Sequence, residues 1–293
     1  MAARPITFLS DYGSDDEFAG VCRAVIARIA PDAHVIDLTH GIQRHDVREG
    51  AIALANSLGF SPPGVHLAVV DPGVGTERRP VAVRVAEEDR ILVGPDNGLL
   101  SLAWERLGGP VDAVDLRESS FRLEPASSTF HGRDLFAPVA ATLALGTELR
   151  EVGEAVDLDA LHALEIPAPR IWPDRIVAHV VRSDRFGNVA LNVRHEDLAD
   201  GPLRLGEPLA VESAGERVGA TFARAFEDVG RGELLLYEDS TRSLALAINR
   251  GSAAELLRLR RDDEVVLRSA QSGRSPRGRR RRTSRSTRSP RGR

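Results

Sequence analysis

The stretch VDPGVGTERR, residues 70–79, stands where a buried strand meets a turn. A Val-rich run at 65–70 leads into it, and such a run closed by Pro-Gly is typical of a strand followed by a tight turn. Ligands of open α/β sheets bind at the carboxyl ends of the strands, so the carboxylate of Asp71 can face a ligand. Gly73 and Gly75 lack a Cβ and let the backbone approach a bound molecule closely. The alternative is that Asp71 only caps its own turn.

Strands and helices alternate around this stretch. The expected strands are 6–9, 33–38, 65–70, 81–85 and 90–93, and the expected helices are 18–30, 46–58, 99–107 and 135–145. This alternation predicts an α/β N-terminal domain, residues 1–165, with a mainly parallel central sheet flanked by helices.

The pattern changes after residue 165. Residues 166–174, IPAPRIWPD, carry three Pro and are interpreted as a linker. Short strands separated by Gly-containing turns fill 175–270 and predict a smaller, all-β domain that is barrel-like or a sandwich. The last segment, 271–293, is rich in Arg and lacks apolar side chains, so we expect a disordered tail.

The composition is typical of a soluble globular protein. The chain has 293 residues, of which 42% are hydrophobic and 28% charged. No apolar stretch is long enough to cross a membrane and no signal peptide is recognisable, so a cytoplasmic protein is the simplest expectation. The single cysteine, Cys22, excludes an intramolecular disulfide framework and a Cys-rich zinc site.

The net charge of −4 hides an uneven distribution. Residues 274–293 contain 10 Arg and no acidic residue, which leaves 29 basic and 43 acidic residues elsewhere, a formal charge of −14. The tail could touch nucleic acid. We favour a solvated appendage, because nothing else in the chain resembles a nucleic-acid-binding motif.

Five short motifs occur together in one order: SDYG at 10–13, VDPGVGTERR at 70–79, PDNG at 95–98, TFHGRD at 129–134 and DRFGN at 184–188. As a set they resemble the S-adenosylmethionine hydroxide adenosyltransferases, relatives of the fluorinase and chlorinase that attack the ribose C5′ of S-adenosylmethionine. The resemblance covers residues 5 to 268. It implies an N-terminal α/β domain, a C-terminal β-barrel and a homotrimer with active sites between subunits.

The resemblance also implies roles for individual residues. Asp71, Arg78 and His131 match the family's water-handling triad, and Asp11 matches the carboxylate that holds the ribose hydroxyls. The groups that meet the methionine amine, the adenine and the methionine carboxylate correspond to Asp184, Asn188 and Ser240. Thr241 stands where the fluorinase has Arg, which leaves recognition of the carboxylate open, although Arg242 is one residue away.

These residue types suit hydrolysis of S-adenosyl-L-methionine to adenosine and L-methionine. Methionine leaves as a neutral thioether and needs no general acid, so the catalyst must hold one water in line behind C5′. Asp71 can take the proton of that water, Arg78 can hold Asp71 ionised, and a neutral His131 can orient the water. No cofactor or metal is implied, since S-adenosyl-L-methionine is itself the substrate.

The nucleophile separates this reaction from halogenation. The halogenating relatives have Tyr at the position of Asp71, and a carboxylate there would repel a halide. The fluorinase has Ser at the position of Gly132, whereas the chlorinase also has Gly. We therefore expect water to be the nucleophile.

Other readings remain open. Asp11 could cap the helix after its strand, His131 could be a capping group, Arg78 could be a solvated charge, and Asp184 and Asn188 could be hairpin turn residues. Alternative functions are a non-catalytic S-adenosylmethionine or adenosine sensor, a halide-using relative, or a metal-dependent hydrolase. The last lacks an H-E-x-x-H motif, and a serine hydrolase lacks a G-x-S-x-G elbow.

Overall fold

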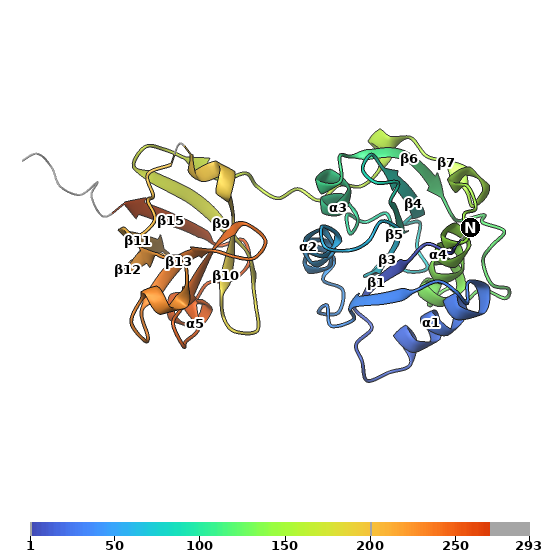
Figure 1. Cartoon of the computed structure of the whole chain (residues 1–293), viewed down its shortest axis with the longest axis horizontal. Coiled ribbons are helices and arrows are strands. Elements are labelled where there is room, and N and C mark those ends of the chain that lie inside the picture. Colours follow the sequence, from blue (N-terminus) through green and yellow to red (C-terminus); the bar gives the residue numbers. More distant parts are fainter. Residues whose placement is uncertain (1, 200, 270–293) are drawn as a thin grey trace, which may run out of the picture. The chain divides into compact units, whose positions relative to one another are not determined.

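The chain divides into two compact units between Glu165 and Ile166 (Figure 1). The structure is a computed structural model, and it describes residues 2–199 and 201–269. The predicted Arg-rich tail lies outside these residues. Within them, no helix is both long and apolar enough to span a membrane.

The first unit is built on a seven-stranded sheet in the order β2-β1-β3-β5-β4-β6-β7. Its strands are β1 (Ile6–Ser10), β2 (Val35–Thr39), β3 (Val65–Val69), β4 (Pro80–Val85), β5 (Ile91–Pro95), β6 (Pro110–Asp115) and β7 (Glu154–Ala155). Its helices are α1 (Phe18–Ile29), α2 (Val47–Leu58), α3 (Ser101–Arg106) and α4 (Ala137–Ala144), with a π-helical turn at Gly132–Phe136 and 3-10 turns at Leu149–Glu151 and Leu158–Ala160.

Helices cover both faces of this sheet, as predicted. One buried cluster joins α1 and α4 to the sheet, and a second joins α2 and α3 to its other face. The side chain of Asp46 fixes the start of α2, because it accepts a hydrogen bond from the Glu49 amide at 2.9 Å. Buried apolar residues on each helix then face the sheet.

The prediction of a mainly parallel sheet needs correction, because the sheet is mixed. The pairs β1–β2, β1–β3 and β3–β5 are parallel, whereas β4–β5, β4–β6 and β6–β7 are antiparallel. Only five residues, 86–90, separate β4 from β5. A connection that short can return the chain only as an antiparallel hairpin, since a parallel crossover needs about a dozen residues.

The second unit is a closed seven-stranded barrel with one additional strand. The strand order is β10-β14-β13-β12-β11-β15-β9-β8, and the pairing of β10 with β9 closes the ring. The strands are β8 (Arg170–Ile171), β9 (Arg175–Ser183), β10 (Val189–Arg194), β11 (Pro208–Ser213), β12 (Glu216–Phe222), β13 (Leu234–Glu238), β14 (Ser243–Ile248) and β15 (Glu264–Ser269). A short helix, α5 (Ala253–Leu257), and 3-10 turns at His195–Leu198 and Phe226–Asp228 complete the unit. The closed ring encloses an apolar core.

Candidate active site

Asp71 lies directly beyond the carboxyl end of β3, where the strand pattern places it. The loop that follows packs against a distant segment: a Cβ at Gly75 would lie 2.7 Å from the Ser128 carbonyl oxygen, and Gly75 has φ +77°. Both conditions exclude a residue with a Cβ at position 75. Gly75 therefore allows the loop of Asp71 to approach the segment that carries His131.

Asp71, Arg78 and His131 meet in one cluster. Arg78 donates from Nε to Asp71 Oδ1 at 3.0 Å and from Nη2 to Asp71 Oδ2. Arg78 Nη2 also lies 3.3 Å from His131 Nδ1. The reading of Arg78 as a solvated surface charge is wrong, because its side chain is only 8% exposed. Arg79 instead pairs with Asp96.

Burial sets the protonation of this cluster. Desolvation raises the pKa of Asp71 above its usual range, and the charges of Arg78 and His131 oppose that rise without cancelling it. Burial, together with the charge of Arg78, lowers the pKa of His131 and favours the neutral imidazole. A carboxylate with a raised pKa beside a neutral histidine is suited to accepting a proton from water.

His131 stands at the start of the helical segment that leads into α4. It is the N-cap of the π-helical turn at Gly132–Phe136, but its side chain makes no capping hydrogen bond. The structure therefore does not support a capping role for the His131 side chain. The imidazole faces Arg78 instead.

Asp11 follows β1 at the same end of the sheet as Asp71. Its Oδ2 accepts a hydrogen bond from the His45 amide at 2.9 Å. The cap of α1 is Glu17, without a side-chain bond, so the reading of Asp11 as a helix cap is wrong. The loop after Ser10 is held in place because Ser10 Oγ contacts His40 Nδ1 at 2.8 Å and accepts from the Tyr12 amide at 3.3 Å.

A cavity of about 350 Å³ contains three of the four predicted residues of this unit. Asp11, Asp71 and His131 line it, while Arg78 does not and lies against Asp71. Arg78 is thus placed to position and tune Asp71. The other lining residues are Tyr12, Asp16, Phe18, Arg44, His45, Val69, Val74, Thr129, Phe130 and Gly132. Of the three aromatic side chains, only those of Tyr12 and Phe130 had a sequence signal, since they adjoin Asp11 and His131 in the motifs.

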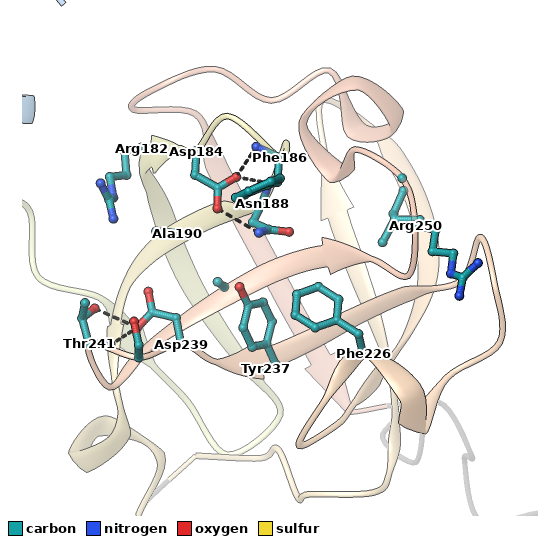
Figure 2. A pocket seen from close by; sticks show the side chains of 14 residues that line it. Arg182, Asp184, Phe186, Asn188, Ala190, Phe226, Tyr237, Asp239, Thr241 and Arg250 are labelled. Atoms are coloured by element: carbon teal, nitrogen blue, oxygen red, sulfur yellow. Dashed lines mark hydrogen bonds between the residues drawn. The ribbon is translucent and has the colours of Figure 1, made fainter. Parts of the chain in front are cut away.

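A second cavity, of about 840 Å³, lies in the barrel unit (Figure 2). Asp184 and Asn188 line it and form one turn: Asp184 Oδ1 accepts from the Phe186 and Asn188 amides at 2.8 and 3.0 Å, and Oδ2 accepts from Asn188 Nδ2 at 2.8 Å. They are turn residues, as the alternative proposed, and they also face the cavity. Ser240 lines the same cavity.

Aromatic side chains form a wall of this second cavity. The rings of Phe226 and Tyr237 lie 5.2 Å apart, and Phe186 is 65% exposed at its edge. Burial raises the pKa of Tyr237 to about 12, so its hydroxyl stays protonated and can donate. Exposed aromatic faces of this kind suit a planar purine base.

The described residues contain no group of three or more His, Cys, Asp or Glu side chains that could hold a metal ion. Each candidate residue of the first unit makes a side-chain contact with another residue of the same chain. The side chains that line the two cavities offer hydrogen-bonding, charged and aromatic groups for an organic ligand.

Two family models together match most of the chain. The SAM hydroxide adenosyltransferase N-terminal domain matches residues 6–153 and the C-terminal domain of the same family matches residues 178–266. The chain belongs to the SAM hydroxide adenosyltransferase family. This confirms the resemblance inferred from the motifs.

Individual relatives agree with the family assignment. The chain is 47% identical over 258 residues to an (R)-S-adenosyl-L-methionine hydrolase of Salinispora tropica, covering 88% of this chain and 95% of that protein. Its identity to a fluorinase of Nocardia brasiliensis is 29% over 278 residues, with 86% and 92% covered. A crystal structure of a conserved protein from Thermotoga maritima is 34% identical, with a TM-score of 0.83 over 89% of this chain and 99% of that one.

Proposed function

We propose that this SAM hydroxide adenosyltransferase hydrolyses S-adenosyl-L-methionine to adenosine and L-methionine. The observation that carries the proposal is the carboxylate of Asp71, which lines a cavity and is held by Arg78 on its other side. The names of the relatives support the same reaction, because the hydrolases are more similar to this chain than the fluorinases are.

In the proposed mechanism, Asp71 accepts a hydrogen bond from a water that attacks ribose C5′ on the side opposite the sulfonium. The C5′–S bond breaks as the C5′–O bond forms, the sulfur takes the bonding electron pair, and the water's proton passes to Asp71. Neutral His131 orients the water, and Arg78 holds the carboxylate. Placing water and sulfonium in line can contribute about 7–11 kcal/mol in favourable cases.

The substrate contacts are also proposals. Asp11 holds the ribose hydroxyls, and its position in the cavity of Asp71 supports this. Asp184, Asn188 and Ser240 bind the rest of the substrate in the barrel cavity, where Phe226 and Tyr237 supply apolar area. We propose no cofactor and no metal, since the sulfonium already provides the leaving group.

Family resemblance further supports a homotrimer in which each active site combines residues of two subunits. We also propose a cytoplasmic location, and residues 1–165 and 175–270 as the two domains, joined by the Pro-rich linker 166–174. A solvated tail at 271–293 completes this organisation.

Incubation of purified protein with S-adenosyl-L-methionine in the presence of a chelator, followed by chromatography, tests the proposed function. We expect adenosine and methionine in equal amounts, with none above background in the protein-free control. A protein that binds the substrate but releases no adenosine would be a sensor and would contradict the proposal. Loss of activity with the chelator would indicate a metal-dependent reaction.

A further inference from the structure

Four residues form a row across neighbouring strands beneath the second cavity. Arg182 on β9 pairs with Ala190 on β10, Ala190 pairs with Ala245 on β14, and Ala245 pairs with Tyr237 on β13. Directly paired residues point to the same face of a sheet, and all four line the cavity. At a strand spacing of about 4.8 Å, three steps separate Arg182 from Tyr237 by about 14 Å.

The row has a small centre and two large ends. Ala190 and Ala245 leave the middle of the cavity open, while a guanidinium and a phenol ring stand at the two ends. Figure 2 shows Arg182 and Thr241 on one side of the cavity, and Phe226 and Arg250 on the other. The row therefore has a guanidinium at one end and aromatic rings at the other, with Arg250 beside the rings, which suits an elongated ligand with a charged end and a planar end.

The turn beside Ser240 supplies no cation to the charged side. The Thr241 hydroxyl donates to Asp239 Oδ1 at 2.7 Å. Arg242 is not among the lining residues: its side chain is 69% exposed and its Nε lies 3.3 Å from Glu238 Oε1. The Thr241 hydroxyl is therefore already used as a donor within its turn, and Arg242 lies outside the lining, so neither brings a cation to a carboxylate inside the cavity.

Acidic groups near Arg182 complete a zwitterion-binding arrangement. Asp184 and Asp239 line the same cavity. Asp184 accepts at Oδ1 from the amides of its turn and at Oδ2 from Asn188 Nδ2, whereas Asp239 accepts at Oδ1 from the amides of its own turn. A carboxylate oxygen can accept more than one hydrogen bond, so Oδ2 of either residue can accept from an ammonium group, while a guanidinium can bind a carboxylate with two parallel hydrogen bonds.

We propose that Arg182 binds the α-carboxylate of the amino-acid part of the substrate and thereby selects substrates that carry it. This deepens the proposed function and rests on it. Arg182, on β9, takes over the role left open by Thr241, which lies in the turn between β13 and β14. The wall of Phe226 and Tyr237 then receives the adenosine end.

The test compares two substrates that differ only in this carboxylate, S-adenosyl-L-methionine and decarboxylated S-adenosylmethionine. In Arg182→Gln we expect KM for the first to rise about 10- to 100-fold with little change in kcat, as loss of a hydrogen-bonded charge predicts. The KM for the decarboxylated substrate should equal that of the wild type. Arg182→Lys should retain part of the preference, because it keeps the charge.

Arg250→Gln is the matched control, since Arg250 lines the same cavity on its aromatic side, and it should leave the substrate preference unchanged. A similar loss for both substrates in Arg182→Gln, or a lost preference in Arg250→Gln, would overturn the proposal. Calorimetric titration of both ligands gives the same comparison without turnover. A wild-type protein that binds but does not cleave would contradict the proposed function alone, and the titration would still decide the role of Arg182.

Discussion

The hydroxyl of Tyr12 lies against the backbone of Gly132, so closely that a Cβ on residue 132 would be 2.0 Å from the Tyr12 oxygen. Both residues line the cavity of Asp71 and His131. Glycine is therefore required at position 132 as long as Tyr12 keeps its place. The Ser that the fluorinase carries at this position would not fit here.

Gly132→Ser should consequently destabilise the protein and reduce turnover. Overpacking of this kind costs about 1–3 kcal/mol of unfolding free energy. Tyr12→Phe removes the oxygen, so the double variant Tyr12→Phe/Gly132→Ser should recover part of the melting temperature. Gly20→Ala in α1 is the control, since nothing lies within 4 Å of its Cβ. Equal melting temperatures for Gly132→Ser and the wild type would show that Tyr12 moves aside at no cost.

The pH dependence of kcat/KM should reveal how the charge of Arg78 affects the pKa of Asp71. The pKa of Asp71 is already raised by burial, and Arg78 opposes that rise. Removing the cation in Arg78→Gln destabilises the carboxylate, so the acidic limb should move upward by about 1–3 pH units. In the wild type Arg78 lowers the pKa of His131, so this pKa should also rise in Arg78→Gln. The rise shifts the acidic limb in the same direction.

Arg79→Gln is the control for this profile, because Arg79 pairs with Asp96 rather than with Asp71. Its acidic limb should coincide with that of the wild type. An acidic limb that moves downward in Arg78→Gln would contradict the assigned electrostatics.

Replacing the proposed base should separate binding from turnover. Asp71→Asn keeps the shape of the side chain and can still accept from Arg78, but it cannot take a proton from water. We expect kcat to fall by about 10²–10⁴ while calorimetric affinity for S-adenosyl-L-methionine changes little. Near wild-type turnover in this variant would assign Asp71 a structural role only.

Mixing two inactive variants tests the proposed trimer with shared sites. Asp71→Asn affects the first unit and Asn188→Ala the second. If each site combines two subunits, co-expressed chains should form some intact sites and regain activity that neither homotrimer has. Light scattering should give a trimeric mass. A monomer, or a mixture without recovered activity, would contradict shared sites.

The outlines of both units could be predicted from sequence because the relevant signals are local. Val-rich runs, helical periodicity and Gly-containing turns marked the elements, and the motif residues Asp71 and His131 fell at element ends. The mixed sheet was missed because strand direction depends on the length of the connection at 86–90, which hydrophobic patterning does not measure. Strand β6 was missed because Pro110 and two Asp residues interrupt its apolar pattern.

Side-chain partnerships across strands could not be predicted in the same way. Sequence spacing did not distinguish Arg78 from Arg79 as the partner of Asp71. Arg182 and Tyr237 are 55 positions apart and become members of one row only through the register of four strands. Arg78 lowers the pKa of Asp71, as expected, but the opposing effect of burial, which is larger, depends on packing that sequence spacing does not show.

The central claim, that water attacks ribose C5′, is tested most directly by turnover in ¹⁸O-labelled water with high chloride and fluoride present. Mass spectrometry of the products should find one ¹⁸O in the 5′-hydroxyl of adenosine, none in methionine, and no 5′-halogenated nucleoside. Unlabelled adenosine, or a 5′-halo-5′-deoxyadenosine as the main product, would contradict the account and remove Asp71 as the water-activating base.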